Sequence, residues 1–209
     1  WIAFVKSTME QPADIHPEFH RMLGRSDKEL RLGQRGCVLW LFGMSGSGKS
    51  TVANAFERRL FTEGRMTQIL DGDNVRTGLN RDLGFSVEDR RENLRRIAEV
   101  AKLFKDAGLV TIVSFITPLE EARASARAII GREDLAMVWI KAKFETCAER
   151  DPKGLYARGA AGELPQFTRE GMIFETPSAP DLILENDETA LEGVVETLHR
   201  YYRTHFSLD

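Results

Sequence analysis

The sequence predicts an α/β fold with a doubly wound parallel sheet of about five strands and helices on both faces. The first reason is that short apolar runs alternate with longer segments in which apolar residues recur every three or four positions. The second is that a glycine-rich segment, residues 43–50, stands between the first apolar run and the first helical segment. Strand, glycine loop and helix in this order are typical of the units that build such sheets.

Apolar patterns place the individual elements. After the glycine loop, Val52, Phe56 and Leu60 lie four positions apart on one helix face, and Gly64 is a stop signal. A second helix is expected between the cap pattern at Ser86 and a stop at Gly108. Further helices are expected over 118–130, 144–150 and from 191 onward, and strands over 37–42, 66–70, 109–115, 135–142 and 182–184.

Two regions show no sustained periodicity. Residues 1–33 are mainly polar and are interrupted by proline and glycine, so we expect an N-terminal arm with one short helix, followed by a single domain over 34–209. Residues 151 to about 180 hold four prolines and four glycines. A loop of this length inside a compact domain is usually functional.

Composition excludes several classes of protein. The charged fraction of 29% and the hydrophobic fraction of 42% are ordinary for a globular domain, and a net charge of −3 argues against nucleic-acid and membrane partners. Cys37 and Cys147 stand in apolar contexts and are expected to be core thiols rather than a disulfide. No stretch resembles a membrane span or a signal peptide, so we expect a cytoplasmic protein. Because the chain begins with Trp1, we expect a piece of a longer polypeptide.

The segment 43–50 reads G-x-x-x-x-G-K-S, the pattern of a phosphate-binding loop. Its glycines allow backbone N–H groups to surround a polyphosphate at the start of a helix. Lys49 is expected to reach the β- and γ-phosphates, and the Ser50 hydroxyl to bind Mg²⁺. The alternative is a glycine- and serine-rich turn that precedes a helix by chance. The lysine and serine in register favour a magnesium–nucleotide site.

Polar residues follow the expected strands at the edge where parallel sheets bind ligands. Asp71 and Asp73 come directly after the second strand, and one of them is expected to face Mg²⁺ or to orient an attacking hydroxyl. An Asp-Gly turn that merely closes the strand is the alternative. The segment 116–118 follows the third strand and lies at the same edge.

Arg90 and Asn93 are three residues apart and therefore share the helix face that carries the apolar stripe. A guanidinium group on that face needs an anionic partner, which is a phosphate or sulfate of a substrate or else a salt bridge to Asp71 or Glu88. Phe85 and Phe167 lie in loops and either stack on a base or anchor their loops against the core.

The segment 150–158, R-D-P-K-G-L-Y-A-R, combines cations with a glycine inside the long loop. These features suit a lid that closes over phosphates and excludes water. An exposed insertion with incidental charge is the alternative, and the length of the loop favours a lid.

The chain resembles the adenylyl-sulfate kinases (APS kinases), which are P-loop kinases of sulfate activation. The most specific segments are D-G-D-N-V-R at 71–76 and D-P-K-G-L-Y at 151–156. The likeness extends from about Gly33 to about Tyr202, through segments 33–36, 45–51, 70–76, 83–86, 89–93, 106–108, 150–156, 162–163 and 167–168. The resemblance implies transfer of the γ-phosphoryl group of MgATP to the 3′-hydroxyl of adenosine 5′-phosphosulfate (APS). It also implies a homodimer, and in some family members the kinase is fused to an ATP sulfurylase.

The resemblance also implies residue roles. Asp73, Lys49 and Thr117 would be catalytic, and Ser50 and Asp73 would bind Mg²⁺. ATP would be bound by Gly43, Ser45, Gly46, Ser47, Gly48, Lys49, Ser50, Thr51, Arg150 and Thr189. APS would be bound by Asp73, Arg76, Phe85, Arg90, Asn93, Ile116, Thr117, Lys153 and Phe167, with its adenine between Phe85 and Phe167.

The chain departs from the family pattern in places. Thr117 replaces a serine to which a phosphorylated intermediate has been assigned, and we expect direct transfer with Thr117 lining the acceptor site. Residues 169–170 and 173–174 differ from the pattern in the outer half of the lid, and Phe42 and Met44 differ from it on either side of Gly43. Two other functions remain as alternatives: a kinase for another hydroxyl acceptor, and a non-catalytic nucleotide-binding domain of a fused protein.

Overall fold

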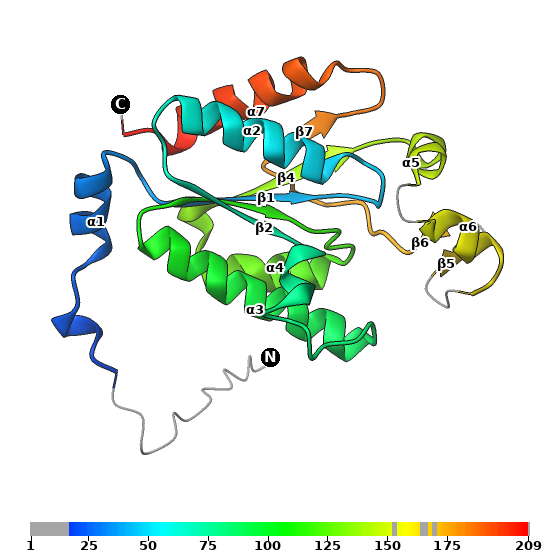
Figure 1. Ribbon diagram of the computed structural model, residues 1–209, viewed down its shortest axis with the longest axis horizontal. Coiled ribbons are helices and arrows are strands. Elements are labelled where there is room, and N and C mark those ends of the chain that lie inside the picture. The colour runs from blue at the N-terminus through cyan, green and yellow to red at the C-terminus, as the bar shows by residue number, and fades with distance from the viewer. Residues whose placement is uncertain (1–16, 152–153, 164–166, 169–170, 209) are drawn as a thin grey trace, which may run out of the picture.

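A computed structural model describes residues 17–151, 154–163, 167–168 and 171–208. Its centre is a five-stranded, all-parallel sheet with the strand order β2-β3-β1-β4-β7. Helices cover both faces of this sheet, as the sequence predicts (Figure 1). The strands are β1 (Cys37–Phe42), β2 (Thr67–Asp71), β3 (Val110–Ser114), β4 (Leu135–Lys141) and β7 (Leu182–Glu185), and no end differs from its expected position by more than one residue.

Strand β1 is central because all six of its side chains are apolar and fully buried. Alternate side chains of a strand point to opposite faces. Cys37, Leu39 and Leu41 accordingly join the core on one face, and Val38, Trp40 and Phe42 join the core on the other. An alternating polar pattern would be wrong for a strand covered on both sides, which explains the continuous apolar run.

The first face is covered by α2 (Lys49–Thr62) and α7 (Leu191–Phe206), which run side by side in Figure 1. The expected stripe of Val52, Phe56 and Leu60 is fully buried. Phe56 packs edge-on against Tyr202 of α7, with 6.0 Å between ring centroids. Tyr202 is 2% exposed, and Tyr201 is partly buried against the same core.

The second face is covered by α3 (Val87–Asp106) and α4 (Glu120–Ile130). The hydroxyl of Ser86 accepts a hydrogen bond from the Asp89 amide, so the expected N-cap of α3 is confirmed. Ile97, Ala98 and Ala101 are fully buried against the sheet. Both helices start near the carboxyl ends of the strands (Figure 1), where ligands bind in folds of this class.

Helix α1 (Arg25–Leu32) lies at the opposite end of the sheet from α5 (Phe144–Arg150) and α6 (Leu155–Ala160) (Figure 1). It is the short helix expected in the first 33 residues, and a 3₁₀ turn at Phe19–Arg21 precedes it. Arg25 forms hydrogen bonds to both carboxylate oxygens of Asp134 and to the Gly36 carbonyl. Lys105 also contacts Asp134, so one carboxylate joins α1, α3 and the turn before β4.

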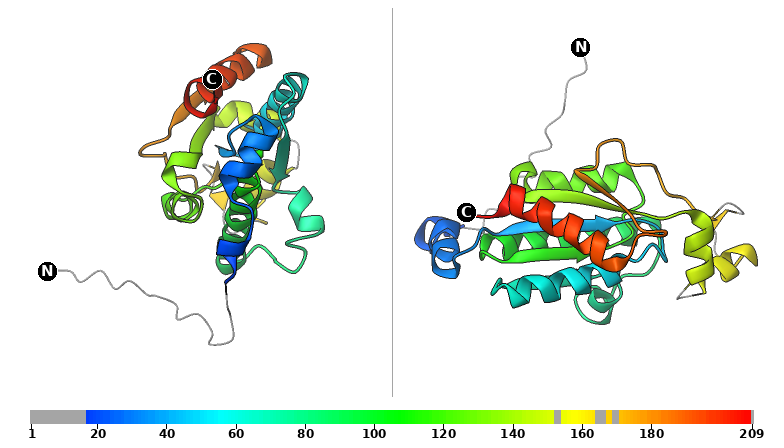
Figure 2. Two further views of the ribbon diagram at one scale, coloured as in Figure 1. Left: turned by 90° about the vertical axis from the view of Figure 1, so that its left-hand side faces the viewer. Right: turned by 90° about the horizontal axis from the view of Figure 1, so that it is seen from above.

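The region 151–180 differs from the structureless loop that the sequence predicts. After α5 (Phe144–Arg150), it contains the short helix α6 (Leu155–Ala160) and a hairpin of β5 (Phe167–Thr168) and β6 (Gly171–Met172). Both cysteines are free and buried, as expected. Figure 2 shows α5 and α6 extending beyond the sheet at the end opposite α1. Within the described residues, every helix is too short or too polar to cross a bilayer.

Candidate active site

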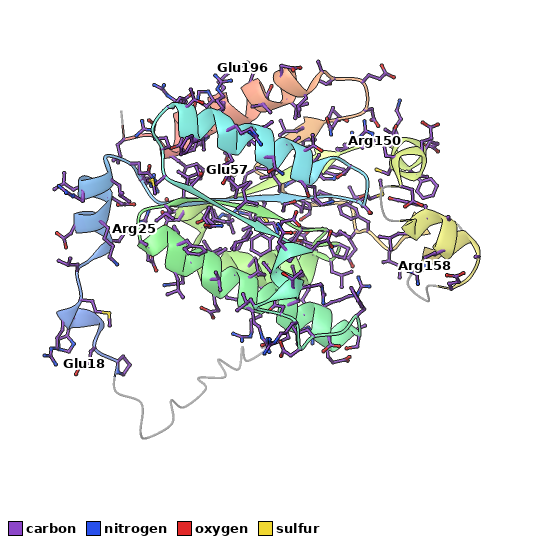
Figure 3. The ribbon with its side chains drawn as sticks, in the orientation of Figure 1. Glu18, Arg25, Glu57, Arg150, Arg158 and Glu196 are labelled. Atoms are coloured by element: carbon purple, nitrogen blue, oxygen red, sulfur yellow. The ribbon has the colours of Figure 1, made fainter. Side chains whose placement is uncertain are left out.

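A cavity of about 1400 Å³ opens at the carboxyl ends of the strands. It is large enough for two nucleotide-sized ligands, since drug-sized sites usually measure about 300–1,000 Å³. Most of the residues that the sequence assigns to a site line it together: Ser45, Gly46, Gly48, Lys49, Ser50, Thr51, Asp73, Arg76, Phe85, Arg90, Asn93, Ile116, Thr117, Arg150 and Thr189. Figure 3 shows Arg150 at this end of the molecule and Arg25 at the other.

The glycine loop connects β1 to α2 in the conformation that its sequence requires. Gly46 and Gly48 have φ values of 76° and 93°, which side chains rarely adopt. A Cβ at Gly46 would also lie 2.5 Å from the Cys147 carbonyl oxygen. Lys49 starts α2, and its ammonium group donates to the carbonyls of Gly43 and Met44 at 3.0 and 2.7 Å. The loop is thereby folded before any phosphate enters.

The Ser50 hydroxyl donates to Oδ2 of Asp71 at 2.7 Å and lies 3.1 Å from the Ser114 hydroxyl. Oδ1 of Asp71 accepts from the Asp73 amide at 3.1 Å, which shapes the turn after β2. Ser50 and Asp71 therefore present a hydroxyl and a carboxylate side by side at the start of α2. These are oxygen ligands of the kind that Mg²⁺ takes when phosphate oxygens supply the rest of its shell.

Arg76 and Arg90 both pack against the ring of Phe85. Their guanidinium carbons lie 4.5 and 5.7 Å from the ring centroid. Arg76 donates to the carbonyls of Leu83 and Gly84, and Arg90 donates to the Phe85 carbonyl. In the described part of the chain neither guanidinium pairs with a carboxylate, so the alternative salt bridge of Arg90 to Asp71 or Glu88 is not formed.

The electrostatics of this pair favour an anion. Burial, together with repulsion from Arg76, lowers the pKa of Arg90. Two cations held close together and partly withdrawn from water gain stability when a phosphate or sulfate enters between them. Phe85 is 66% exposed although it is large and apolar, and it lines the cavity.

Asn93 is buried on the first turns of α3 beside the cavity. Its Oδ1 accepts a hydrogen bond of 2.8 Å from Nδ2 of Asn80. With the oxygen engaged in this way, the amide nitrogen is the group left for a ligand. Arg91 and Arg95, elsewhere on α3, form exposed ion pairs with Glu121 and Glu92 at the rim of the cavity.

The strand-end segment Ile116–Pro118 is held at each of its carbonyl groups by a different element. The Ile116 carbonyl accepts a hydrogen bond from the backbone amide of Gly43, and the Thr117 carbonyl accepts one from the Arg123 guanidinium group. The Pro118 carbonyl accepts one from the backbone amide of Glu175. Thr117 has a φ of 41°, in the left-handed region that side chains rarely adopt, and its side-chain oxygen accepts a hydrogen bond of 2.9 Å from the indole N–H of Trp40. It is only 1% exposed.

On the other side of the glycine loop, Arg150 and Asn186 hold the loop from outside. Arg150 donates to the Gly46 carbonyl at 3.3 Å and to the Asn186 carbonyl at 3.1 Å. The side-chain nitrogen Nδ2 of Asn186 donates to the Ser47 carbonyl at 2.7 Å. Thr189 lines the same part of the cavity.

Asp151 and Tyr156 fix the base of the expected lid. The Asp151 carboxylate accepts from the amides of Leu155, Tyr156 and Ala157, and so caps α6. The Tyr156 hydroxyl donates to the Ser45 carbonyl at 2.8 Å, which joins α6 to the glycine loop. Its ring packs edge-on against Phe144.

Some expected site residues do not line the cavity or cannot be placed. Gly43 and Ser47 are buried within the glycine loop itself. Lys153 lies outside the described residues, and only the backbone of Phe167 is described, as the first residue of β5. Of the two acids expected after the second strand, Asp71 lies beside Ser50. The structure adds Ser114 and Asn186, each at a strand end or directly after one. That position was the signal that could have identified them.

The fold and this site define a P-loop kinase, an enzyme that transfers phosphoryl groups from a nucleotide. Relatives specify its kind. The sequence pattern of the adenylylsulphate kinase family matches residues 35–185. The chain is 52% identical over 185 residues to an adenylyl-sulfate kinase of Phocaeicola vulgatus, covering 88% of this chain and 91% of that protein. It is 46% identical over 195 residues to a probable adenylyl-sulfate kinase of Halalkalibacterium halodurans, covering 93% and 95%.

A solved structure agrees with these relatives. The APS kinase CysC of Mycobacterium tuberculosis, determined in complex with AMPPNP and APS, superposes with a TM-score of 0.74 at 43% identity. The superposition covers 80% of this chain and 97% of that one. The present chain belongs to the adenylyl-sulfate kinase family, whose members phosphorylate adenosine 5′-phosphosulfate.

Proposed function

We propose that this chain transfers the γ-phosphoryl group of ATP to the 3′-hydroxyl of APS within the cavity, giving ADP and 3′-phosphoadenosine 5′-phosphosulfate. The observation that carries this proposal is the pair of guanidinium groups of Arg76 and Arg90, which pack against one exposed ring and share one cavity with the glycine loop. The glycine loop accounts for a polyphosphate donor. The arginine pair accounts for a second, separate anion with an aromatic group attached.

On the donor side, the loop amides and Lys49 hold the β- and γ-phosphates. Lys49 exchanges its contacts with the Gly43 and Met44 carbonyls for phosphate oxygens, which costs little because carbonyls are weaker partners for an ammonium group than phosphates. Arg150 and Thr189 border the nucleotide beyond the loop. The full set is Gly43, Ser45, Gly46, Ser47, Gly48, Lys49, Ser50, Thr51, Arg150 and Thr189.

The donor set fits Mg²⁺ held jointly with the nucleotide. Ser50 and Asp71 already adjoin, and Asp73 follows in the same turn. Within the described ranges no three acidic, histidine or cysteine side chains gather as a preformed metal site. This suits an ion that completes its shell with phosphate oxygens and water. When bound, Mg²⁺ supplies positive charge that offsets the charge developing on the transferred phosphoryl group.

On the acceptor side, Arg76, Arg90 and Asn93 hold the phosphosulfate, and Phe85 stacks on the adenine. Asp73 orients the 3′-hydroxyl and accepts its proton, since a loose phosphoryl-transfer transition state needs an aligned nucleophile more than a strong base. Ile116 and Thr117 border the acceptor from β3. Lys153 and Phe167 complete the acceptor set from the lid.

Transfer is direct and does not pass through Thr117. Its hydroxyl is buried and bonded to Trp40, and its backbone is fixed by Arg123. A phosphorylated Thr117 would require a doubly charged group beside the indole in the core, which is costly. The residue therefore shapes the acceptor site with its backbone.

Three features of the organisation belong to the same proposal. Residues 34–209 form the kinase domain, and 1–33 form an arm whose helix α1 attaches to it through Arg25. The chain works in the cytoplasm. It forms a homodimer, as the family resemblance implies. An associated or fused ATP sulfurylase would supply its acceptor.

The test is a coupled assay of ADP release with ATP, Mg²⁺ and APS. Adenosine 5′-monophosphate, which lacks the sulfate, serves as a matched acceptor control. We expect turnover with APS at least about tenfold faster than with the monophosphate, because the arginine pair is left partly unsatisfied without the second anion. Phosphorylation of another sugar or nucleoside with no turnover of APS would contradict the proposal.

A further inference from the structure

Arg123 is a charged residue in the core that does not line the cavity. It lies on α4, and its side chain is 3% exposed. An arginine is almost never buried so deeply without specific partners. The identity of those partners indicates what Arg123 does.

The guanidinium group joins three separate segments. Nη1 donates to the Thr117 carbonyl at 2.9 Å, and Nη2 donates to the Glu175 carbonyl at 2.9 Å. Nε and Nη2 both contact Oε2 of Glu120, at 3.0 and 2.8 Å. The end of β3, the start of α4 and the segment after β6 thus meet at one side chain.

Aromatic rings enclose the same guanidinium group. Its carbon lies 5.1 Å from the centroid of the Phe42 ring and 5.8 Å from that of Phe174. Phe174 also stacks on Phe42 and on Trp139, each at 6.4 Å. Rings of this kind stabilise a cation that water cannot reach.

The segment at Glu175 is bound to the acceptor side independently of Arg123. Its amide donates to the Pro118 carbonyl at 2.9 Å, and Oε2 accepts from the Glu120 amide at 2.6 Å. A shift of the strand-end segment Ile116–Pro118 would therefore shift Glu175 as well. Arg123 stands at the centre of this small network and contacts both of its sides.

Thr117 needs such support because of its backbone. A β-branched residue at φ 41° is strained by roughly 1–2 kcal/mol and keeps that conformation only when its surroundings enforce it. Trp40 holds the side-chain oxygen and Arg123 holds the carbonyl. Without Arg123 the carbonyl would lose its buried partner, and the peptide would be free to relax.

We propose that Arg123 is a positioning residue of the acceptor site, which fixes the Thr117 backbone against the Phe174–Glu175 segment without touching substrate. The proposal rests on the placement of APS beside Ile116 and Thr117 given above. It follows that binding of APS depends on Arg123 far more than binding of ATP does, since the described contacts of Arg123 include none to the glycine loop.

The planar fork is essential to this role. A lysine ammonium group at the same position keeps the charge and the ring contacts. However, it is a point charge and does not reproduce the divergent bonds to the Thr117 and Glu175 carbonyls together. The conservative variant Arg123→Lys is therefore an informative test, and it is more certain to fold than Arg123→Met.

The experiment compares Arg123→Lys and Arg123→Met with Arg127→Met in the full chain. Arg127 is one turn later on the same helix and pairs with Asp181 at 2.8 Å, away from Thr117. The KM for APS, the KM for ATP, kcat and the melting temperature are measured for each variant. We expect the KM for APS to rise about tenfold in Arg123→Lys and more in Arg123→Met, with the KM for ATP within about twofold of wild type.

The outcomes separate this role from others. A lowered melting temperature with both KM values unchanged would make Arg123 merely structural and overturn the proposal, and so would an equal rise in both. A similar selective rise in Arg127→Met would also overturn it. The same assay measures turnover of APS by the wild type, and its absence would contradict the proposed function. If the wild type turns over APS and the KM for APS is unchanged in Arg123→Lys, only the role of Arg123 is contradicted.

Discussion

The hydroxyl of Ser50 donates a hydrogen bond of 2.7 Å to the carboxylate of Asp71. The first turn of α2 is thereby joined to the last residue of β2. The same carboxylate accepts a hydrogen bond from the backbone amide of Asp73, so one side chain positions both the start of α2 and the Asp-Gly-Asp turn after β2. We therefore expect a change at Asp71 to alter both the binding of Mg²⁺ and the position of Asp73.

Asp71→Asn should weaken the dependence on magnesium. The variant keeps the shape and a carbonyl oxygen for Ser50 but loses the charge that attracts the ion. We expect roughly 10- to 100-fold more Mg²⁺ to be needed for half-maximal rate. Asp82→Asn, at an exposed acid paired with Arg96, is the control. Identical magnesium activation curves for wild type and Asp71→Asn would refute this role.

Asp73→Ala and Lys49→Ala should fail in different ways. Loss of Asp73 should lower kcat by about 10²- to 10⁴-fold while ATP binding is largely kept, because the group acts on the acceptor hydroxyl. Loss of Lys49 should weaken ATP binding itself, because the phosphates lose their cation. Titration of ATP onto each variant, with kcat measured in parallel, checks the contrast. Normal turnover of Asp73→Ala would show that the role given to Asp73 is wrong.

Thr117→Val should remain active. The valine has the same branched shape but leaves the Trp40 indole N–H without its acceptor, which should lower the free energy of unfolding by about 1–3 kcal/mol. Thr117→Ser, which keeps the hydroxyl, should be close to wild type in stability. Incubation of the wild type with ATP should add no phosphate detectable by mass spectrometry. A phosphorylated Thr117, or complete inactivity of folded Thr117→Val, would contradict direct transfer.

Tyr156→Phe should weaken ATP binding selectively. The variant keeps the ring contact with Phe144 but loses the hydrogen bond to the Ser45 carbonyl, and so loosens α6 from the glycine loop. A lost hydrogen bond of about 1 kcal/mol corresponds to about a fivefold rise in the KM for ATP. Tyr201→Phe on α7 is the matched control. Equal KM values for ATP in both variants and wild type would argue against this coupling.

Stability in acid should depend on Asp134. Burial would raise the pKa of its carboxyl, but hydrogen bonds from Arg25 and Lys105 outweigh burial and hold the pKa well below its usual value. The unfolded chain therefore binds this proton more readily than the native one. The contribution to stability is full above about pH 4 and is lost as pH falls toward the lowered native pKa.

Asp134→Asn should accordingly lower the free energy of unfolding at pH 7 by about 2–3 kcal/mol and flatten its decline below pH 4. Glu99→Gln, which removes an exposed pair with Arg95 at 3.8 Å, should change stability by less than about 1 kcal/mol. Denaturant unfolding from pH 7 to pH 2.5 makes the comparison. Parallel curves for wild type and Asp134→Asn would exclude this linkage.

The order and bounds of the main elements could be predicted because each carries a complete local pattern. Helix α5 begins and ends at the expected residues, Phe144 and Arg150, and the stripe of α2 is buried as expected. Helix α6 could not be predicted in this way. It has six residues, too few to show a period, and it depends on Asp151 and on the contact of Tyr156 with Ser45.

Much of the candidate site followed from strand ends, whereas its internal connections did not. The spacing of Arg90 and Asn93 placed both on the cavity side of α3. No local pattern shows that Ser50 meets Asp71, or that Asn186 reaches Ser47, because these contacts join segments far apart in the chain. Arg123 has the sequence context of a surface arginine, and only the packing of Phe42 and Phe174 around it reveals a core residue.

The central position of β1 has a consequence for how this site can evolve. The loops after β2 and β3 lie on one side of β1 and carry the acceptor residues that line the cavity, whereas Arg150 and Asn186 follow β4 and β7 on the other side. The two halves of the site share little more than the glycine loop and Lys49. Mutations that alter acceptor preference can therefore accumulate around Asp73 and Ile116 while the grip on the nucleotide is inherited unchanged.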